Sequence, residues 1–430
     1  MAKSTQPVRA PASVSPRAAP VPSQSKRQNS RIGFITFALF VTTFCQTGQL
    51  AKLPIQFILK DELSVKANEM ALFLAVILIP WYAKPLFGMV ADSIPLLGSR
   101  RRIYLILSAL AAAACWIGMA LAPRRFGVLL GIGILLNCFI MAANAVVGGL
   151  LVYEGCLHGI TGRLASMRVF VKNGAMLLAG PVGGFLATRA FGWTTGLAAG
   201  LYCSLALLTA LAVREDVAHR ESGVLSSLYR EFKVAGTSRG LLITAGMLFL
   251  VHIEPGFGTP LFYVQTESLH FTSTFIGGLA VLYGVFALLA AAVYMRACQM
   301  LSLRLLLIYS IICTALTTVP YLAYHSRPSA IWIEMIAGFG AGLAQLPLFD
   351  LAARATPRGR ESLGYAIMMS VWNLGMSVSD VLGSWLFENY HLTFHSLIWL
   401  NAATTLLVLF FIPAIPQQLI SGREGEFNWG

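Results

Sequence analysis

Ionisable side chains interrupt several long apolar runs of this 430-residue chain. Lys52 and Lys172 fall in its first half, whereas Glu254 and Asp380 fall in its second half. A charge inside an apolar membrane span costs roughly 2.5–3.5 kcal/mol on insertion scales, unless it is paired or reached by water. We therefore expect these four residues to line a wet site between the halves, with lysines on one wall and carboxylates on the other.

These residue types divide the chemistry between them. A lysine ammonium would bind an anionic group of a substrate, whereas Glu254 and Asp380 would take up and release a proton during a transport cycle. Simple neutralisation of the lysines by the acids is an equally weighted alternative. Asn144 and Asn373 are candidate substrate contacts, although helix-to-helix hydrogen bonds are the commoner use of an intramembrane asparagine.

Other ionisable residues receive a structural interpretation. Lys84 and Asp350 lie near the ends of apolar runs, where snorkelling or pairing accounts for them, and Glu334 is interpreted in the same way. His252 precedes Glu254 by two residues, so the two side chains leave a helix in different directions. A packed or hydrated histidine is favoured over a proton relay.

Backbone breaks accompany two of the charged positions. Residues 254–260 read EPGFGTP, and their two prolines interrupt helical hydrogen bonding in the middle of an apolar run. Broken membrane helices are tolerated where their backbone lines a cavity or is buried in protein. The first apolar run has a similar break at Pro54, beside Lys52. Breaks at corresponding positions in two halves are typical of a transport site.

Membrane-spanning helices must position these residues. The chain is 57% hydrophobic and 11% charged, whereas soluble proteins carry about 25% charged residues. A spanning helix needs about 20 mostly apolar residues. We expect twelve such spans, at 31–59, 67–92, 102–122, 127–153, 163–188, 193–213, 239–266, 273–296, 304–324, 328–353, 361–387 and 394–415.

A polar segment, residues 214–238, separates six spans from six. We therefore predict an all-α integral membrane protein of twelve transmembrane helices in two six-helix bundles, of the major facilitator type. The expected parts are a disordered basic tail, two bundles joined by a linker, and a second tail, at 1–30, 31–213, 214–238, 239–416 and 417–430. A transit peptide is the minority interpretation of the first segment.

The distribution of positive charge predicts the topology. Of 31 lysines and arginines, 22 would lie on the side of the N-terminus and six on the opposite side. Cytoplasmic loops carry such an excess, so both termini are expected in the cytoplasm. The same bias accounts for the net charge of +13 without a nucleic acid partner. We expect a multi-pass protein of the cell (inner) membrane, with an organellar membrane as the alternative.

The connector after the second span carries a candidate gate. Gly88 is followed by Asp92 and then by a basic cluster, which resembles the major facilitator loop signature. Such a network can hold one face of a transporter shut until the bundles rock. A positive-inside anchor is the alternative. The expected gating residues are Gly88, Asp92, Arg100, Arg101 and Arg102, together with Arg163, Arg360 and Glu361 at the starts of the fifth and eleventh spans.

Glycines in the fifth span permit two interpretations. Gly180-Pro181-Val182-Gly183-Gly184 resembles part of the signature of proton-coupled antiporters, but the first glycine of the longer signature is replaced by Met176. Close packing through small residues is favoured.

Three stretches of the chain resemble the folate–biopterin transporter family. They lie at 48–65 with 84–107, at 260–277 and at 345–375, and cover about a fifth of the chain. The resemblance implies uptake of pterin or folate, driven by protons. Members usually carry acids in the fourth span, where this chain has Asn144 and glycines, and often an acid at the position of Gly258. If those acids have a role, Glu254 and Asp380 would have taken it over.

The predicted function is secondary active transport of a small organic anion, folate- or pterin-like, by alternating access with proton coupling. The alternatives are a proton-driven exporter of another small organic molecule and a non-transporting membrane sensor or assembly factor. We predict no enzyme activity, because the chain has no nucleophile–base pair, metal-ligand set or nucleotide loop. We expect no cofactor and no metal, partners limited to the anion, protons and the lipid bilayer, and a monomeric protein.

Overall fold

The computed structural model describes residues 22–87, 101–158, 160–213, 239–356 and 361–422. Within these ranges every regular element is helical, as predicted. The first half contains α1 (Pro22–Phe44), α2 (Lys52–Phe57), η1 (Ile58–Glu62), α3 (Ala67–Ile77), α4 (Ile79–Tyr82), α6 (Arg102–Leu121), α7 (Phe126–His158), α8 (Thr161–Leu186) and α9 (Phe191–Ala212).

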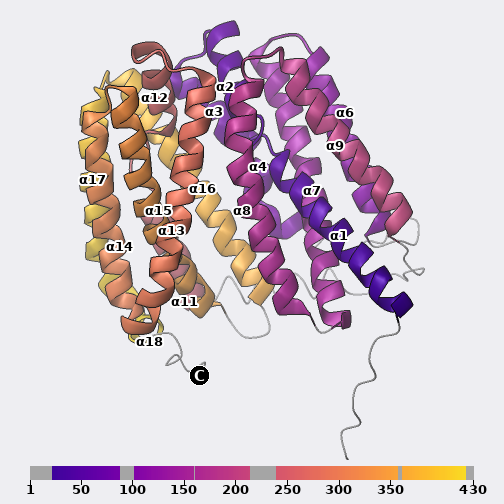
Figure 1. The fold of residues 1–430 in the computed structure, drawn as a ribbon. Coiled ribbons are helices and arrows are strands. Elements are labelled where there is room, and N and C mark those ends of the chain that lie inside the picture. Colours follow the sequence, from indigo (N-terminus) through magenta and orange to yellow (C-terminus); the bar gives the residue numbers. More distant parts are fainter. Residues whose placement is uncertain (1–21, 88–100, 159, 214–238, 357–360, 423–430) are drawn as a thin grey trace, which may run out of the picture.

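The second half contains α11 (Arg239–Val251), α12 (Gly258–Tyr263), η2 (Val264–Ser268), α13 (Ser273–Met300), α14 (Leu303–Thr318), η3 (Val319–Ala323), α15 (Arg327–Ala355), α16 (Glu361–Asn389), α17 (Phe394–Leu407), η4 (Val408–Ala414) and α18 (Gln417–Ile420). The two halves stand side by side in Figure 1.

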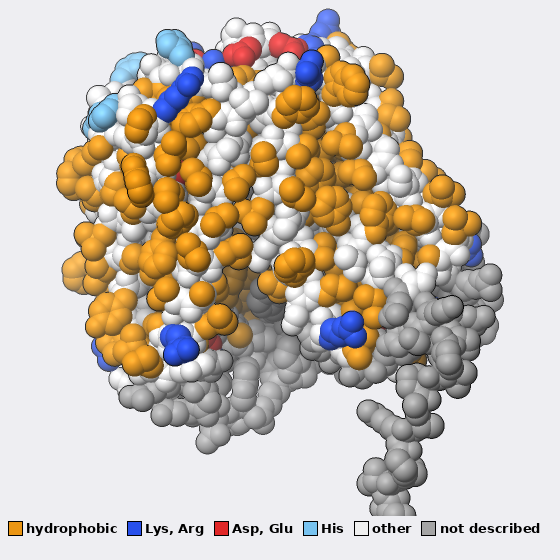
Figure 2. Space-filling model, in the orientation of Figure 1, with side chains coloured by type: hydrophobic (Ala, Val, Ile, Leu, Met, Phe, Trp, Pro, Cys, Tyr) orange, Lys and Arg blue, Asp and Glu red, His pale blue; other side chains and the backbone are white. Residues whose placement is uncertain are grey.

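Apolar helices make up the described structure. Eight of them are long and apolar enough to cross a membrane, and α16 with the interrupted pairs α1–α2, α3–α4 and α11–α12 accounts for the other expected spans. Large apolar side chains face outward, including Leu121 at 82% and Phe170 at 80% exposure. Figure 2 shows apolar side chains over the flanks and charged ones near the two ends, as expected of a protein in a bilayer.

Both predicted tails contain helix. The helix α1 begins at Pro22 rather than at residue 31, so it extends into the segment predicted to be a disordered tail. After residue 416, α18 packs against α15, and Arg354 Nη1 donates to the carbonyl of Gly422 at 2.9 Å. The linker 214–238 lies outside the described residues.

The break in the first span is displaced from its predicted position at Pro54. The chain leaves the helix at Phe44 and resumes it at Lys52. Pro54 is the third residue of α2, and Pro260 is likewise the third residue of α12. The first turn of a helix has no internal partner for its N–H groups, so proline is tolerated there and does not break the helix.

An internal repeat joins these two short helices. Each is followed directly by a turn of π-helix, η1 or η2, and then by a residue with φ of +50°, Ser64 or His270. The backbone bonds that close the two turns also correspond, from Val65 N to Leu59 O and from Phe271 N to Gln265 O. The two halves therefore share a local fold that their sequences only weakly reveal.

Two seams hold the halves together. In one, α3 and α4 lie against α16; in the other, α8 lies against α13. We call the end of the bundle that carries Pro22 and Gly422 the terminal end, and the opposite end the far end; these are the lower and upper ends in Figure 1.

Polar contacts close the far end. The hydroxyl of Tyr263 donates to the carbonyl of Val65, and Lys60 Nζ lies 3.8 Å from Glu267 Oε1. The backbone nitrogen of Ala67 donates to Glu388 Oε1 at 3.3 Å. Each contact joins a residue of one half to a residue of the other.

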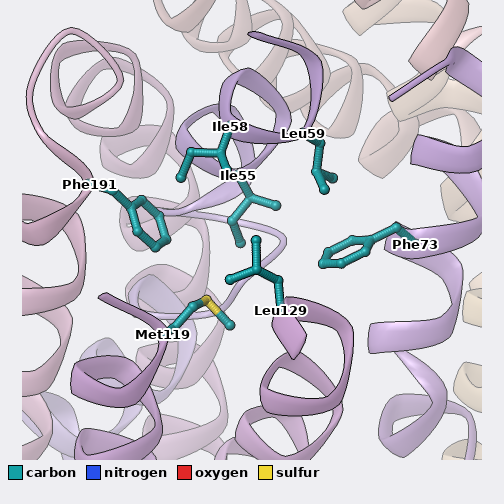
Figure 3. A pocket seen from close by; sticks show the side chains of 7 residues that line it. All are labelled: Ile55, Ile58, Leu59, Phe73, Met119, Leu129 and Phe191. Atoms are coloured by element: carbon teal, nitrogen blue, oxygen red, sulfur yellow. The ribbon is translucent and has the colours of Figure 1, made fainter. Parts of the chain in front are cut away.

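The core of the first half is tightly filled near the far end. Figure 3 shows apolar side chains of α2, η1, α3, α6, α7 and α9 converging there, among them Ile55, Phe73, Met119 and Phe191. Only about 10 Å³ of free space remains between them. A void of that size with an apolar lining stays dry, so we regard it as a packing gap and not as a ligand site.

Candidate functional site

The break between α11 and α12 is held open by α16 and α17. Ser379 Oγ donates to the carbonyl of Glu254 at 2.6 Å, and Gly256 N donates to the carbonyl of Ser379 at 2.9 Å. Asn401 Nδ2, from α17, donates to the carbonyl of Pro255 at 3.0 Å. Side chains and backbone of neighbouring helices thus satisfy groups that a continuous helix would bond internally.

Asp380 caps the helix that follows the break. Its Oδ1 accepts a hydrogen bond from Thr259 N at 2.8 Å, and its Oδ2 accepts one from Thr259 Oγ1 at 2.5 Å. A negative charge at a helix N-terminus also interacts favourably with the helix dipole. A Cβ atom at Gly258 would lie 3.2 Å from Oδ1. An acid at that position would therefore stand against the carboxylate of Asp380.

Glu254 lies within the same break but is not bonded in the same way. Its side chain is half-buried, and its Oε2 atom is buried without a hydrogen-bond partner among the described residues. A buried polar atom of this kind is uncommon in native proteins and is frequent at functional sites. The structure therefore brings Glu254 and Asp380 to one break, but only Asp380 is fully engaged.

His252 is a packed residue, as favoured from the sequence. Its Nδ1 lies 2.8 Å from the carbonyl of Leu248, and its ring lies edge-on to Trp372 with 4.0 Å between centroids. Its exposure is 7%. His252 therefore lies beside the break, and no hydrogen bond among the described residues joins it to Glu254.

Three cations gather on the first half. Arg168 and Lys172 lie one helical turn apart on α8. Their positive charges act on Lys84, which follows α4 in the chain. In the described part of the chain, none of the three forms an ion pair with an acid. Lys172 thus belongs to a larger group than predicted, and Lys84 has a different setting from the snorkelling or pairing expected for it.

Lys52 interacts with a different acid. Its charge acts on Glu334, a residue of α15 that is 7% exposed. The hydroxyl of Tyr324 donates to Glu334 Oε1 at 3.4 Å, and Gln265 Nε2 donates to Tyr324 at 2.7 Å. Glu334 is thus a member of a polar cluster of the second half, on which the charge of Lys52 acts from the first half. The four residues predicted to share one site are distributed over three clusters.

Open space separates the halves toward the terminal end. The closest approaches of α8 to α13 involve Gly180 and Gly184 on one helix, and Ser273 and Gly277 on the other. Nearer the terminal end, Arg168 and Lys172 of α8 are exposed. Figure 2 shows the surface hollowed between the lower parts of the halves. The exposed cations of α8 thus lie on a stretch beyond the closed part of this seam.

The glycines of the fifth span are packing residues, as favoured from the sequence. A Cβ atom at Gly184 would lie 2.5 Å from the carbonyl oxygen of Ser273, and one at Gly183 would lie 2.6 Å from that of Leu50. Ser273 Oγ also donates to the carbonyl of Gly184 at 2.8 Å. The glycines allow two backbones of opposite halves to touch.

Intramembrane asparagines serve different purposes. Asn137 binds Thr47 and the indole of Trp81, at 3.1 and 3.0 Å from its Oδ1, and so ties α7 to the break in the first span. Asn144 on α7 and Asn373 on α16 are partly buried, and their role as substrate contacts stays a prediction.

Much of the predicted gate lies outside the described residues, namely Gly88, Asp92, Arg100 and Arg360. Of the remainder, Arg101 stacks over the ring of Tyr153 at 5.0 Å and Arg102 donates to the carbonyl of Ala210 at 2.8 Å. Arg163 is exposed, and Glu361 is the first residue of α16.

Sequence and structure comparisons place this arrangement among known proteins. The model of a family described as the BT1 family matches residues 46–423. A folate-biopterin transporter of Synechocystis is 27% identical over 412 residues, covering 88% of this chain and 81% of that protein. Folate transporter 1 of Plasmodium falciparum is 21% identical, with coverage of 86% and 77%.

Solved structures show the same fold at low identity. The nucleoside transporter NupG superposes with a TM-score of 0.69 at 13% identity, over 91% of this chain and 98% of that chain. The xylose transporter XylE from E. coli, in an inward open conformation, superposes with a TM-score of 0.61 at 13% identity, over 91% and 96%.

Proposed function

Because the chain belongs to the BT1 family and has the major facilitator fold, it is a multi-pass membrane transporter, and we propose that it moves a folate- or pterin-like organic anion. The names of its relatives support this substrate class. Movement would occur by rocking of the bundles 31–213 and 239–416 about the two seams, so that a central site opens to alternate sides.

One observation carries the proposal for an anion. Lys84, Arg168 and Lys172 form a cationic cluster without an acidic partner in the described ranges. Like charges held together raise each other's energy, so a cluster of this kind is maintained most readily when an anion binds it. A carboxylate-bearing substrate would be attracted to the exposed cations of α8, and the guanidinium of Arg168 can bind a carboxylate in bidentate fashion.

The closed far end indicates the state of the cycle. Contacts of Tyr263, Lys60 and Glu388 join the halves there, which supports a state that is open at the terminal end. We propose that this end faces the cytoplasm, as the distribution of positive charge predicts. The protein would then be a cell-membrane transporter in an inward-open state.

Glu254 is the proposed proton carrier. Its Oε2 atom is buried without a bond among the described residues, and it stands at the helix break where bending changes its surroundings. Protonation would remove the cost of a buried charge and allow the halves to rock. Asp380 was predicted for the same role, but its two bonds to Thr259 favour a capping role.

Transport by purified protein in liposomes tests the proposal. We expect saturable uptake of labelled folate, stimulated by an inward proton gradient and abolished when the gradient is dissipated. The variants Lys84→Gln, Arg168→Gln and Lys172→Gln should each raise KM about tenfold or more, since each removes a charge-assisted contact worth about 1.5–3 kcal/mol.

Arg304→Gln provides the matched control. Arg304 is exposed at the start of α14, so its loss changes the net charge equally without touching the cluster. Its KM should equal that of the unaltered protein. Unchanged KM values in all three cluster variants would reject the anion site, and absence of any saturable folate or pterin uptake would reject the substrate class.

A further inference from the structure

A long groove runs along the seam between α3–α4 and α16. Its volume is about 590 Å³. Most of its lining is apolar, with Leu72, Ile79 and Val76 on one wall and Leu374, Val378 and Trp385 on the other. It is distinct from the cationic cluster, because the residues that line it come from these three helices alone.

The groove faces away from the interior of the protein. On α3 its residues lie on the side opposite Met70, Phe73 and Ile77, which pack into the core of the first half. On α16 they lie opposite Ser379 and Gly383, which contact the break between α11 and α12. Leu72 is 50% exposed and Trp385 is 41% exposed. In a membrane, this surface meets lipid.

The dimensions of the groove fit one leaflet. Along the first wall it extends from Asn68 to Tyr82, a helical rise of about 20 Å. The hydrocarbon of one leaflet is about 15 Å thick, half of the apolar core of a bilayer. The groove therefore runs from the far-end interface to the bilayer midplane. A groove with this apolar lining excludes water, and its length can accommodate an extended acyl chain.

The ends of the groove differ in polarity. Asn68 and the exposed carboxylate of Glu69 stand at its far-end mouth. At its inner end, Tyr82 already donates to Ser377 Oγ at 2.6 Å, across the seam. A carboxylate at the mouth is complementary to a lipid with a cationic ammonium in its headgroup.

We propose that this groove binds one phospholipid of the far-end leaflet, with an acyl chain between α3 and α16 and an ethanolamine headgroup beside Glu69. The walls belong to opposite halves, so rocking of the halves changes the width of the groove. The lipid therefore binds the far-closed state more tightly than the far-open state and stabilises it.

Photolabelling tests the proposal independently of transport. The full-length protein is placed in nanodiscs with phosphatidylethanolamine that carries a diazirine in its acyl chain, and labelled peptides are identified by mass spectrometry. We expect labelling of α3 and α16 to exceed that of the lipid-facing helix α17 about fivefold, and excess unlabelled phosphatidylethanolamine to remove the difference. Equal labelling of the three helices would overturn the proposal.

Two sets of variants sharpen the test. Ala75→Phe and Val378→Phe fill the groove and should reduce its labelling to the α17 level, whereas Leu407→Phe on α17, at a site 54% exposed, should not. Replacement of ethanolamine by glycerol in the headgroup, or Glu69→Gln, should lower groove labelling several-fold. Equal labelling by the two lipids would refute the headgroup assignment. If a filled variant fails to fold, competition in the unaltered protein still decides the matter.

Discussion

The carboxylate of Asp380 on α16 holds both the backbone nitrogen and the hydroxyl of Thr259, at 2.8 and 2.5 Å, and so fixes the start of α12. The contact spans 121 residues of sequence. It ties α12, which follows the break, to α16, whose Ser379 binds the backbone at the break. Asp380 is therefore first a structural residue, and its variants separate capping from proton coupling.

Asp380→Ala should lower the free energy of unfolding by about 1–2 kcal/mol, because a lost N-cap costs that much. Asp380→Asn keeps an acceptor for Thr259 N and should cost less. Thermal unfolding in detergent measures both. If Asp380 only caps, Asp380→Asn keeps proton-stimulated uptake; loss of that stimulation with unchanged stability would assign it to coupling after all.

Glu254→Gln should uncouple transport from protons. The amide cannot ionise, so uptake should no longer respond to a proton gradient, while exchange of labelled for unlabelled substrate continues. The comparison is with Asp61→Asn, an exposed far-end acid whose ion pair with Lys60 contributes little. A Glu254→Gln protein that still accumulates substrate against a gradient would exclude this residue as the carrier.

Gly184→Ala should disturb the α8–α13 seam. The added methyl group would lie 2.5 Å from the carbonyl of Ser273, and such overpacking costs about 1–3 kcal/mol. We expect a lower melting temperature and a reduced maximal rate of uptake. Gly174→Ala, on the same helix but with open space around it, is the control and should behave as the unaltered protein. Equal effects of the two substitutions would contradict the packing role.

Tyr263→Phe should favour opening of the far end. It removes the hydrogen bond to Val65, worth about 1 kcal/mol, which shifts the equilibrium between states about fivefold. Spin labels on the two halves at the far end would report the shift as a longer distance distribution. Tyr309→Phe, at a position 56% exposed on α14, is the control and should leave the distribution unchanged. An unchanged distribution in Tyr263→Phe would show that this hydrogen bond does not hold the far end closed.

The helical architecture was predictable because the bilayer restricts it. Each span must carry about 20 apolar residues, so hydropathy alone locates most of the helices. The break in the first span was misplaced because Pro54 is conspicuous in sequence, whereas the chain leaves the helix before it, at residues 45–51. Proline marks the first turn after the break in both halves.

The candidate site was predictable only in part. Sequence locates intramembrane charges, but partners such as Thr259 for Asp380 come from distant segments and cannot be read from spacing. Arg168 and Lys172 were within reach, since residues four apart share one face of a helix. Their approach to Lys84 depends on tertiary packing, as does the position of Glu334 beside the aromatic hydroxyls.

At its closest points the α8–α13 seam brings main-chain atoms together, because Gly180, Gly184 and Gly277 carry no side chains there. A contact of this kind requires small residues at a few positions and does not depend on the side chains elsewhere. Substitutions along the cationic stretch of α8 can therefore accumulate without altering the pivot. Substrate preference can therefore change at these positions while the contact between the two halves stays the same.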